Sequence, residues 1–238
     1  MLLCPYCGCH RLIKNRSTRG VPKWTCKSCG RQTSLRGRHA GIAPDKQKKH
    51  VEAVLLYLSG LSLNAIAFLK SVVASTILNW VRPFARPWAA KPNPGPEGVI
   101  VMELDEIWHC VGHKGKKLWI WLAFCRDTGQ LVDWQCGNRD QATLDPLLAR
   151  LTAWKACLYG TDAYVCYDRA VPVGHHFMGK EETWRLEQIH SRVRHWLARF
   201  RRRTLVVSKS VEMVELSIAL FARFRINGSL RELLPLPA

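Results

Sequence analysis

The segment Val99-Ile-Val-Met-Glu-Leu-Asp105 decides the fold of this chain, because it places an acidic residue at the end of an apolar run that is typical of a buried strand. A second apolar run, Ala156-Cys-Leu-Tyr-Gly-Thr-Asp162, also ends on an aspartate. A carboxylate inside a buried strand is costly unless it is paired or binds a metal ion. The two runs therefore predict a pair of functional aspartates.

The segments between the two aspartates complete the predicted sheet. Apolar patterns predict strands over 118–126 and 130–136, and a helix over 141–152 leads into the run that ends at Asp162. Three strands, a helix, a strand and a later helix is the order of a ribonuclease H-like domain, in which the first and fourth strands are parallel neighbours. This order predicts that Asp105 and Asp162 lie close together.

Glu187 is the third candidate carboxylate, on an arginine-rich segment that predicts a long helix. Arg194 follows seven residues later on about the same helical face, which favours a metal ligand beside a phosphate-binding arginine. The alternative is a solvated charged face. Two or three carboxylates with substrate phosphate oxygens suffice to bind Mg²⁺ or Mn²⁺. Because a pair of ions about 4 Å apart can drive an in-line displacement, Asp105, Asp162 and Glu187 predict phosphodiester chemistry.

Other acidic residues compete for these roles. Strand alternation places Glu103 and Asp105 on one face of the strand and Glu106 on the other. Asp105 is favoured because it ends the apolar run. Asp127 in a turn and Asp140 at a helix start have sufficient local roles, so we predict that both are structural.

The composition predicts a polyanion as the partner. The chain has 238 residues, a formal net charge of +18 and a pI near 9.9, and such a field attracts nucleic acid. No apolar run approaches the 18 residues that a membrane-spanning helix needs, and the N-terminus shows no signal-peptide pattern. We therefore expect a cytoplasmic, nucleoid-associated protein that binds no membrane, with its ten cysteines reduced. We further expect a homo-oligomer on double-stranded DNA.

Residues 1–40 carry the pattern of a zinc ribbon. They contain no Asp or Glu and hold two C-x2-C pairs separated by 18 residues. The four candidate Zn²⁺ ligands are Cys4, Cys7, Cys26 and Cys29. Four thiolates can close a tetrahedral site, which would supply the folding energy that so short and basic a segment lacks. Cys9 and His10 complicate the ligand set, since either could replace a neighbouring cysteine.

Residues 45–82 predict three short helices in a helix-turn-helix arrangement, with Ser62 as the N-cap of the second and with Ile66 and Leu69 facing the third. An ordinary three-helix bundle gives the same pattern. The third helix would enter a major groove. The candidate DNA-binding residues, on this helix and on the later arginine-rich segment, are Ser75, Thr76, Asn79, Arg82, Arg192, Arg194, Arg199 and Arg202. Residues 83–98, with five prolines and two glycines, predict an extended linker.

These residues resemble the InsA/InsB-type transposases of the insertion sequence one family over nearly the whole chain. The matching landmarks are the four-cysteine ribbon, Gly60-Leu61-Ser62, Glu103-Leu-Asp-Glu-Ile-Trp108, Thr161-Asp162 with Tyr167, Leu186-Glu187, Arg194 and Ser208-Lys-Ser210. The resemblance implies that Asp105, Asp162 and Glu187 are a DDE-type catalytic triad, and that the amino-terminal half recognises the terminal repeats of a mobile element. His190 stands where such families commonly have asparagine.

We therefore expect an α/β protein in which a ribonuclease H-like catalytic domain over 99–238 follows a zinc ribbon over 1–40, a helix-turn-helix module over 45–82 and a linker over 83–98. The expected activity is that of an insertion-sequence transposase, which cleaves DNA at the element's ends and transfers the freed strand to target DNA. A DNA-binding regulator with an inactive catalytic domain and a general ribonuclease H-like nuclease remain alternatives. A tyrosine recombinase is disfavoured, because no tyrosine follows Tyr167.

Overall fold

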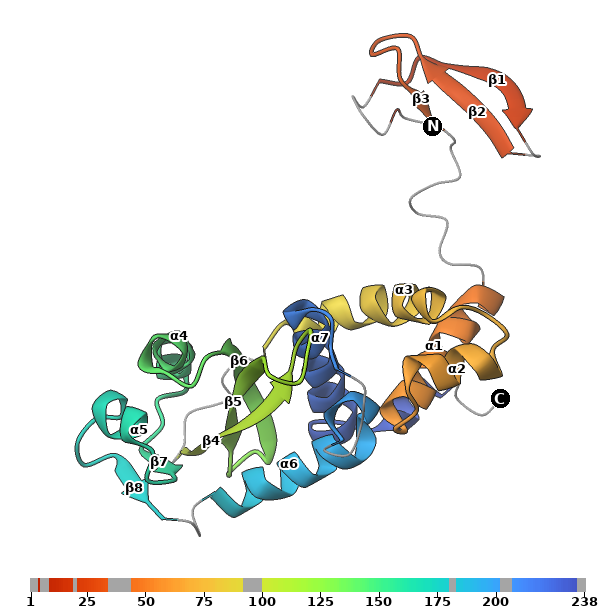
Figure 1. Ribbon diagram of the computed structural model, residues 1–238. Coiled ribbons are helices and arrows are strands. Elements are labelled where there is room, and N and C mark those ends of the chain that lie inside the picture. The colour runs from red at the N-terminus through yellow and green to blue at the C-terminus, as the bar shows by residue number, and fades with distance from the viewer. Residues whose placement is uncertain are drawn as a thin grey trace. The chain divides into compact units, whose positions relative to one another are not determined.

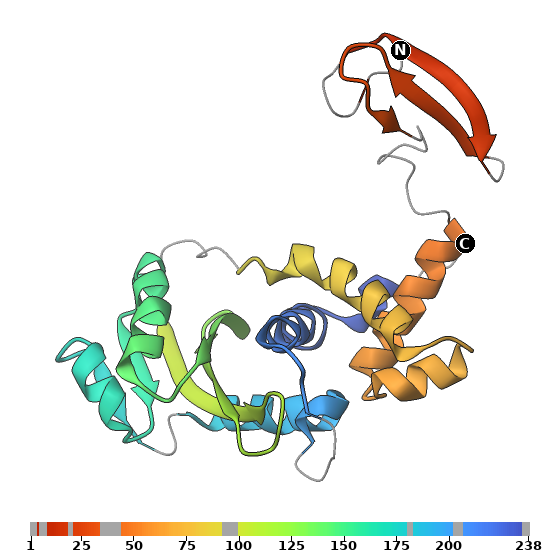
Figure 2. The same ribbon diagram turned by 45° about the horizontal axis from the view of Figure 1, so that its top comes forward.

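The computed structural model describes residues 4, 9–18, 21–33, 44–91, 100–179, 183–201 and 207–234. The chain forms two compact units, residues 1–49 and residues 50–238. Figures 1 and 2 show the elements of both units. Two predicted site residues, Cys7 and Arg202, lie outside the described residues, as do residues 92–99 of the proline-rich segment.

The amino-terminal unit contains a three-stranded antiparallel sheet in the order β1-β2-β3. Its strands are β1 (Leu12–Thr18), β2 (Val21–Cys26) and β3 (Gln32–Thr33). The turn after β2 contains Gly30 at φ +68°, a left-handed conformation that glycine adopts without strain. The Gly30 N–H donates to the carbonyl of Cys26 (2.9 Å), so the turn brings Cys29 back beside Cys26.

The remaining elements of the chain are, in order, α1 (Pro44–Leu58), α2 (Leu63–Leu69), α3 (Ala74–Ala85), the 3₁₀ helix η1 (Arg86–Ala89), β4 (Val101–Cys110), β5 (Lys117–Cys125), β6 (Gln130–Gly137), α4 (Gln141–Leu151), η2 (Thr152–Trp154), β7 (Leu158–Thr161), α5 (Val165–Ala170), β8 (His176–Met178), α6 (Trp184–Trp196), η4 (Ala198–Phe200), α7 (Val211–Phe221), the π-helix η5 (Ala222–Ile226) and η6 (Leu230–Leu233).

A five-stranded mixed sheet in the order β6-β5-β4-β7-β8 organises the second unit. β4, β5 and β6 are antiparallel, whereas β4 pairs with β7, and β7 with β8, in parallel. The first and fourth strands of this sheet are therefore parallel neighbours, as the order of elements predicts.

Both faces of the sheet are buried because apolar residues occupy both sides of its central strands. On β5, Ile120 and Leu122 belong to the core cluster that includes the buried residues of α6, while Trp121 and Ala123 belong to the cluster that includes α4. Figures 1 and 2 show α6 against one face and α4 against the other. The sheet thus has a helix on each of its faces.

The three predicted helices between residues 44 and 85 are present. Ser62 is the N-cap of α2, and its hydroxyl accepts a hydrogen bond from the Ala65 N–H (3.1 Å), as predicted. Ile66 is buried, but Leu69 is 59% exposed, so the expected packing of Leu69 is wrong. The buried side of α2 is centred on Ile66 and Ala67, and Leu69 at its last position lies away from that side.

The proline-rich segment is helical where the structure describes it up to Ala89, which corrects the expectation of an extended linker from residue 83. α3 continues through Pro83 to Ala85, and η1 follows directly. The rings of Phe84 and Trp88 pack against Phe224, at 6.3 Å and 5.3 Å between centroids, which offsets the hydrogen bond lost at the proline.

The helical segment α1–α3 and the sheet share one hydrophobic core. Tyr57 of α1 and Ile77 of α3 are fully buried in the cluster that also contains Ile107 of β4. The Tyr57 and Ser217 hydroxyls hydrogen-bond across this core at 2.7 Å. Of the described helices, none is by itself long and apolar enough to cross a membrane. The helix α2 and the helical segment Ala74–Ala89 reach that length and apolar composition only when taken together, and the pair is bent by 110°.

Candidate active site and metal centre

β4 carries the acidic residues of the candidate site, and it continues past Asp105 to Cys110 because its pairing with β5 extends to Cys110 opposite Lys117. Asp105 therefore lies within the strand, and the expectation that it ends the strand is wrong. The predicted alternation of the acidic side chains is present. Glu103 accepts a hydrogen bond from the Leu186 N–H of α6 (3.3 Å), whereas Glu106, on the other face, accepts one from the Tyr167 hydroxyl of α5 (3.0 Å).

The other buried acids of the sheet each have an arginine partner. Glu103 pairs with Arg126 (Nε to Oε1, 2.6 Å), Glu106 pairs with Arg139, and Asp133 of β6 pairs with Arg150 (Nε to Oδ2, 2.8 Å). These pairs compensate the burial of the carboxylates. Asp140 is the N-cap of α4, which is the local role predicted for it. Asp127 instead accepts a hydrogen bond from the Val101 N–H at the start of β4 (2.7 Å), so its role is structural but not confined to its own turn.

Asp105 differs from these acids, since none of the described Lys or Arg side chains forms an ion pair with it. Its side chain is only 16% exposed, and its Oδ1 accepts the Glu106 N–H at 2.7 Å. Burial, together with the carboxylates of Glu106, Asp162 and Glu187, raises the pKa of Asp105 to about 7. The protonated form is favoured because burial and the neighbouring carboxylates disfavour the charge, and no described Lys or Arg pairs with it.

Asp162 follows β7 directly, next to β4. The last residue pair between the parallel strands β4 and β7 is Glu103 with Gly160. Asp105 and Asp162 each follow this pair by two residues, so they are the positions that the same register would place opposite each other. The Tyr164 N–H donates to Asp162 Oδ1 (3.0 Å), which orients the carboxylate. Asp162 also lines an open hollow with Arg139, Ala163, Tyr164, Met178 and Gly179.

Glu187 lies in the first turn of α6 and is exposed. One turn later, His190 Nδ1 lies 3.6 Å from Asp105 Oδ2, so α6 brings Glu187 and His190 to the β4 side of the site. Burial, with a further contribution from Arg194, lowers the pKa of His190 to about 3. A neutral His190 cannot balance the charge of Asp105.

The carboxylates of Asp105, Asp162 and Glu187 do not lie close enough together to form a ligand set for a single ion. Among the described residues, only Cys4, Cys26 and Cys29 form a group of three such donors whose atoms all lie within 4.8 Å of one another. Asp162 and Glu187 nevertheless both contribute to the raised pKa of Asp105, so both lie near enough to interact with it electrostatically. An acidic site of this kind, lacking Lys or Arg partners in the described part of the chain, fits divalent cations bound by oxygen ligands.

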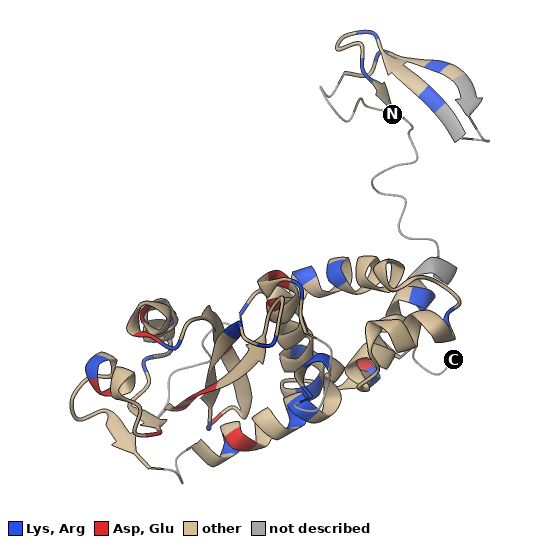
Figure 3. Cartoon of the chain, in the orientation of Figure 1, with Lys and Arg blue, Asp and Glu red and all other residues tan. Residues whose placement is uncertain are grey.

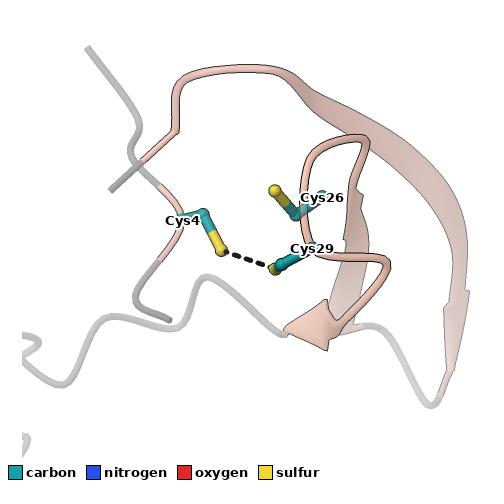
Figure 4. Close-up of side chains that lie close together, drawn as sticks. All are labelled: Cys4, Cys26 and Cys29. Carbon is teal, nitrogen blue, oxygen red and sulfur yellow. Dashed lines mark hydrogen bonds between the residues drawn. The ribbon is translucent and has the colours of Figure 1, made fainter. Parts of the chain in front are cut away.

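The thiol groups of the amino-terminal unit fit Zn²⁺. Figure 4 shows Cys4, Cys26 and Cys29 pointing toward one another, and the Cys4 and Cys29 sulfur atoms are 3.7 Å apart. Tetrahedral zinc with Zn–S bonds of about 2.3 Å separates its sulfur ligands by about 3.8 Å. Cys9 lies outside this group, and its sulfur accepts a hydrogen bond from the Ser28 hydroxyl (2.8 Å).

The candidate DNA-binding residues occupy different environments. In Figure 3, Lys and Arg recur along α3 and α6, with acidic positions on β4 and near the start of α6. Ser75, Asn79 and Arg192 are exposed, and Thr76, Arg82 and Arg194 are half-buried. Arg199 is buried, and it lies in η4 rather than in α6, because the helix ends at Trp196.

Sequence reasoning missed Arg139 and Tyr164. The Arg139 guanidinium lies 4.0 Å from the Tyr164 ring centroid and 4.8 Å from that of Trp119, beside the hollow at Asp162. No local pattern predicts this cluster, because it forms where the start of α4 meets the start of α5. The position of Tyr164, two residues after Asp162, was the available signal.

Comparison with known proteins gives a consistent result. The family described as IS1 transposase matches residues 98–226. The chain is 35% identical over 122 residues to the insertion element iso-IS1n protein InsB of Shigella dysenteriae, which covers 51% of this chain and 93% of that protein. It is 34% identical over 115 residues to the insertion element IS1 protein InsB of Shigella flexneri, and this match covers 48% of this chain and 88% of that protein.

A structural likeness is much weaker. A chain in the structure of the simian T-cell lymphotropic virus intasome in complex with PP2A regulatory subunit B56 gamma aligns over 78% of this chain and 76% of its own length. The identity is 14% and the TM-score is 0.37, a likeness too distant to support a conclusion.

Proposed function

Because the chain belongs to the IS1 transposase family, we propose that it is the DNA transposase of an insertion sequence, which cleaves DNA at the element's ends and joins the freed strand to target DNA. The matching residues, 98–226, contain every element from β4 to η5. They include the three carboxylates to which we assign catalysis, Asp105, Asp162 and Glu187.

The observation that carries the proposal is that none of these three acids forms an ion pair with a Lys or Arg side chain among the described residues, although Arg139 lies near Asp162. The chain has 36 Lys and Arg against 18 Asp and Glu, and the neighbouring acids Glu103, Glu106 and Asp133 all have arginine partners. In so basic a protein, the buried charge of Asp105, with two further acids near it and no such partner, is costly unless cations from solution bind there.

The strand order supports a ribonuclease H-like fold for this part of the chain, because three antiparallel strands precede a fourth that is parallel to the first. Asp105 and Asp162 would bind the cations from adjacent strands, and Glu187 from α6. Backbone N–H groups hold one oxygen of Asp105 and one of Asp162, which leaves the other oxygen of each free to act as a ligand.

Mg²⁺ or Mn²⁺ bound there would activate the attacking oxygen and stabilise the leaving one. The protein's own contribution is positioning and neutralisation of charge, so hydrolysis at the element's end and transesterification into the target need no covalent enzyme intermediate. Arg194, on the same side of α6 as Glu187, would bind substrate phosphate oxygens. Arg192 and Arg202 would extend this contact, Arg202 lying outside the described residues.

The amino-terminal unit and the helices α1–α3 are proposed to bind DNA, including the element's terminal repeats. Cys4, Cys26 and Cys29, with Cys7 outside the described residues, would hold a structural Zn²⁺ in a ribbon. Thr76 and Asn79 of α3 would reach bases in a helix-turn-helix arrangement. We propose that the protein acts on DNA in the cytoplasm as a homo-oligomer and without a membrane.

The test is a cleavage and strand-joining assay with the element's own ends. Asp162→Asn should abolish both steps while binding of the ends persists, because the change removes a ligand charge and keeps the shape. Asp127→Asn is the matched control and should keep most activity, since Asp127 lies in the turn before β6 and an asparagine oxygen there can still accept the hydrogen bond from the Val101 N–H. A wild-type chain that binds its ends but never cuts them would point instead to a DNA-binding regulator.

A further inference from the structure

A pocket of about 370 Å³ lies within the second unit, where α3 approaches η4 and the start of α7. We call it the seam pocket. The polar side chains that line it include those of Ser62, Ser75, Arg82, Arg199, Lys209 and Ser210. Ser75 and Arg82 share this face of α3 with Leu78, so two of the four candidate base-reading residues of α3 line the pocket.

Arg199 is the buried charge of the pocket. It is 8% exposed, and its Nε has no hydrogen-bond partner among the described residues. Its Nη1 donates to the Ser208 hydroxyl (3.1 Å), and its guanidinium lies 5.5 Å from the Tyr57 ring centroid. None of the described carboxylates forms an ion pair with it. Burying a guanidinium without a counter-anion is strongly unfavourable, so the site favours an incoming anion.

The surrounding groups reinforce this preference. α3 begins at the pocket, and its N-cap residue Val73 makes no side-chain hydrogen bond to the first turn. The N–H groups there carry the positive end of the helix dipole. Lys209 is exposed at the rim. Glu212 offsets part of the charge, because its Oε2 lies 3.6 Å from Arg82 Nε, but it does not pair with Arg199 or Lys209.

We infer that the seam pocket binds a phosphate group of the DNA backbone between Arg199, Lys209 and the first turn of α3. The inference rests on the proposed function, because it takes DNA as the source of the phosphate. A planar guanidinium with unused N–H donors matches phosphate oxygens. A contact here would hold α3 and the segment from η4 to α7 against the same DNA strand. It would position the protein without distinguishing one base sequence from another.

Ser75→Asp tests the site by placing a carboxylate in the pocket at the second residue of α3. Ala142→Asp is the matched control, because it makes the same change at the exposed second residue of α4. The full-length chain is unfolded thermally in inorganic phosphate and in sodium chloride at equal ionic strength. Phosphate should raise the Tm of the wild type and of Ala142→Asp by about 2–4 °C more than it raises that of Ser75→Asp, because all three share the general stabilising effect of phosphate over chloride. Equal responses in the two variants, or none in the wild type, would overturn the site.

The source of the phosphate is tested with labelled duplex DNA. The slope of log affinity against log salt should be shallower by about 1 for Ser75→Asp than for Ala142→Asp, since one phosphate contact is lost while both variants add the same charge. Equal slopes combined with the phosphate-specific Tm response would assign the pocket to free phosphate and overturn the DNA contact. Neither readout requires cleavage, so a chain that passes both tests but never cuts DNA contradicts the proposed function alone.

Discussion

Replacing Asp105 with asparagine should stabilise the protein in magnesium-free solution above pH 7. The pKa of Asp105 rises from its ordinary value of 3.8 to about 7 through burial and the neighbouring carboxylates. Between these two pH values the folded chain keeps a proton that the unfolded chain has lost, so the free energy of unfolding falls as the pH rises. The difference between 3.8 and about 7 corresponds to a loss of about 4 kcal/mol above pH 7.

Asparagine carries no charge, and its side-chain oxygen can still accept the Glu106 N–H. Asp105→Asn should therefore be more stable than the wild type by up to about 4 kcal/mol at pH 8, and the difference should approach zero near pH 4. Urea unfolding followed by tryptophan fluorescence, with zinc retained, measures both values. Added Mg²⁺ should stabilise the wild type by mass action and have less effect on the variant.

Asp145→Asn is the control, because Asp145 is exposed on α4 and only accepts a hydrogen bond from the Gln141 side chain. It should change the free energy of unfolding by no more than about 0.5 kcal/mol at either pH. The reasoning is refuted if Asp105→Asn is no more stable than the wild type at pH 8, or if its advantage does not change with pH.

Three further outcomes are expected. The purified chain should contain about one zinc ion, lost in Cys26→Ser and kept in Cys9→Ser, as elemental analysis can measure. Glu187→Gln should abolish cleavage, and combining it with Asp162→Asn should cost nothing more, because the carboxylates act as one unit in single-turnover assays. Deleting residues 1–43 should leave the melting of the remainder nearly unchanged, whereas deleting residues 1–82 should prevent cooperative unfolding, because it exposes the core that the helices cover.

The order of the strands could be predicted because each strand follows from a local pattern. The apolar run before Asp162 and the runs on either side of Asp127 are β7, β5 and β6 of the structure. The length of β4 could not be predicted in the same way. The polar residues after Asp105 indicate the end of a strand, but pairing with β5 satisfies their backbone groups as far as Cys110.

The order of elements predicts that Asp105 and Asp162 belong to parallel neighbouring segments, and β4 and β7 do pair in parallel. The groups around the candidate carboxylates could not be predicted. The contact between His190 and Asp105, and the position of Arg139 beside Asp162, depend on where α6 and α4 cross the sheet. Such crossings depend on packing between distant segments, and a single sequence contains no local signal for them. The catalytic roles of the three carboxylates stay predictions.

The shared core of α1–α3 and the sheet constrains how this protein can exchange parts with its relatives. Because Tyr57 and Ile77 are buried among residues of β4 and α7, a helical segment from another chain would have to bring matching apolar surfaces with it. A chimera joined within the proline-rich segment separates two halves of one core. A junction before Pro44 leaves that core intact, so residues 1–43, with their five cysteines, are the part that can be exchanged without cutting it.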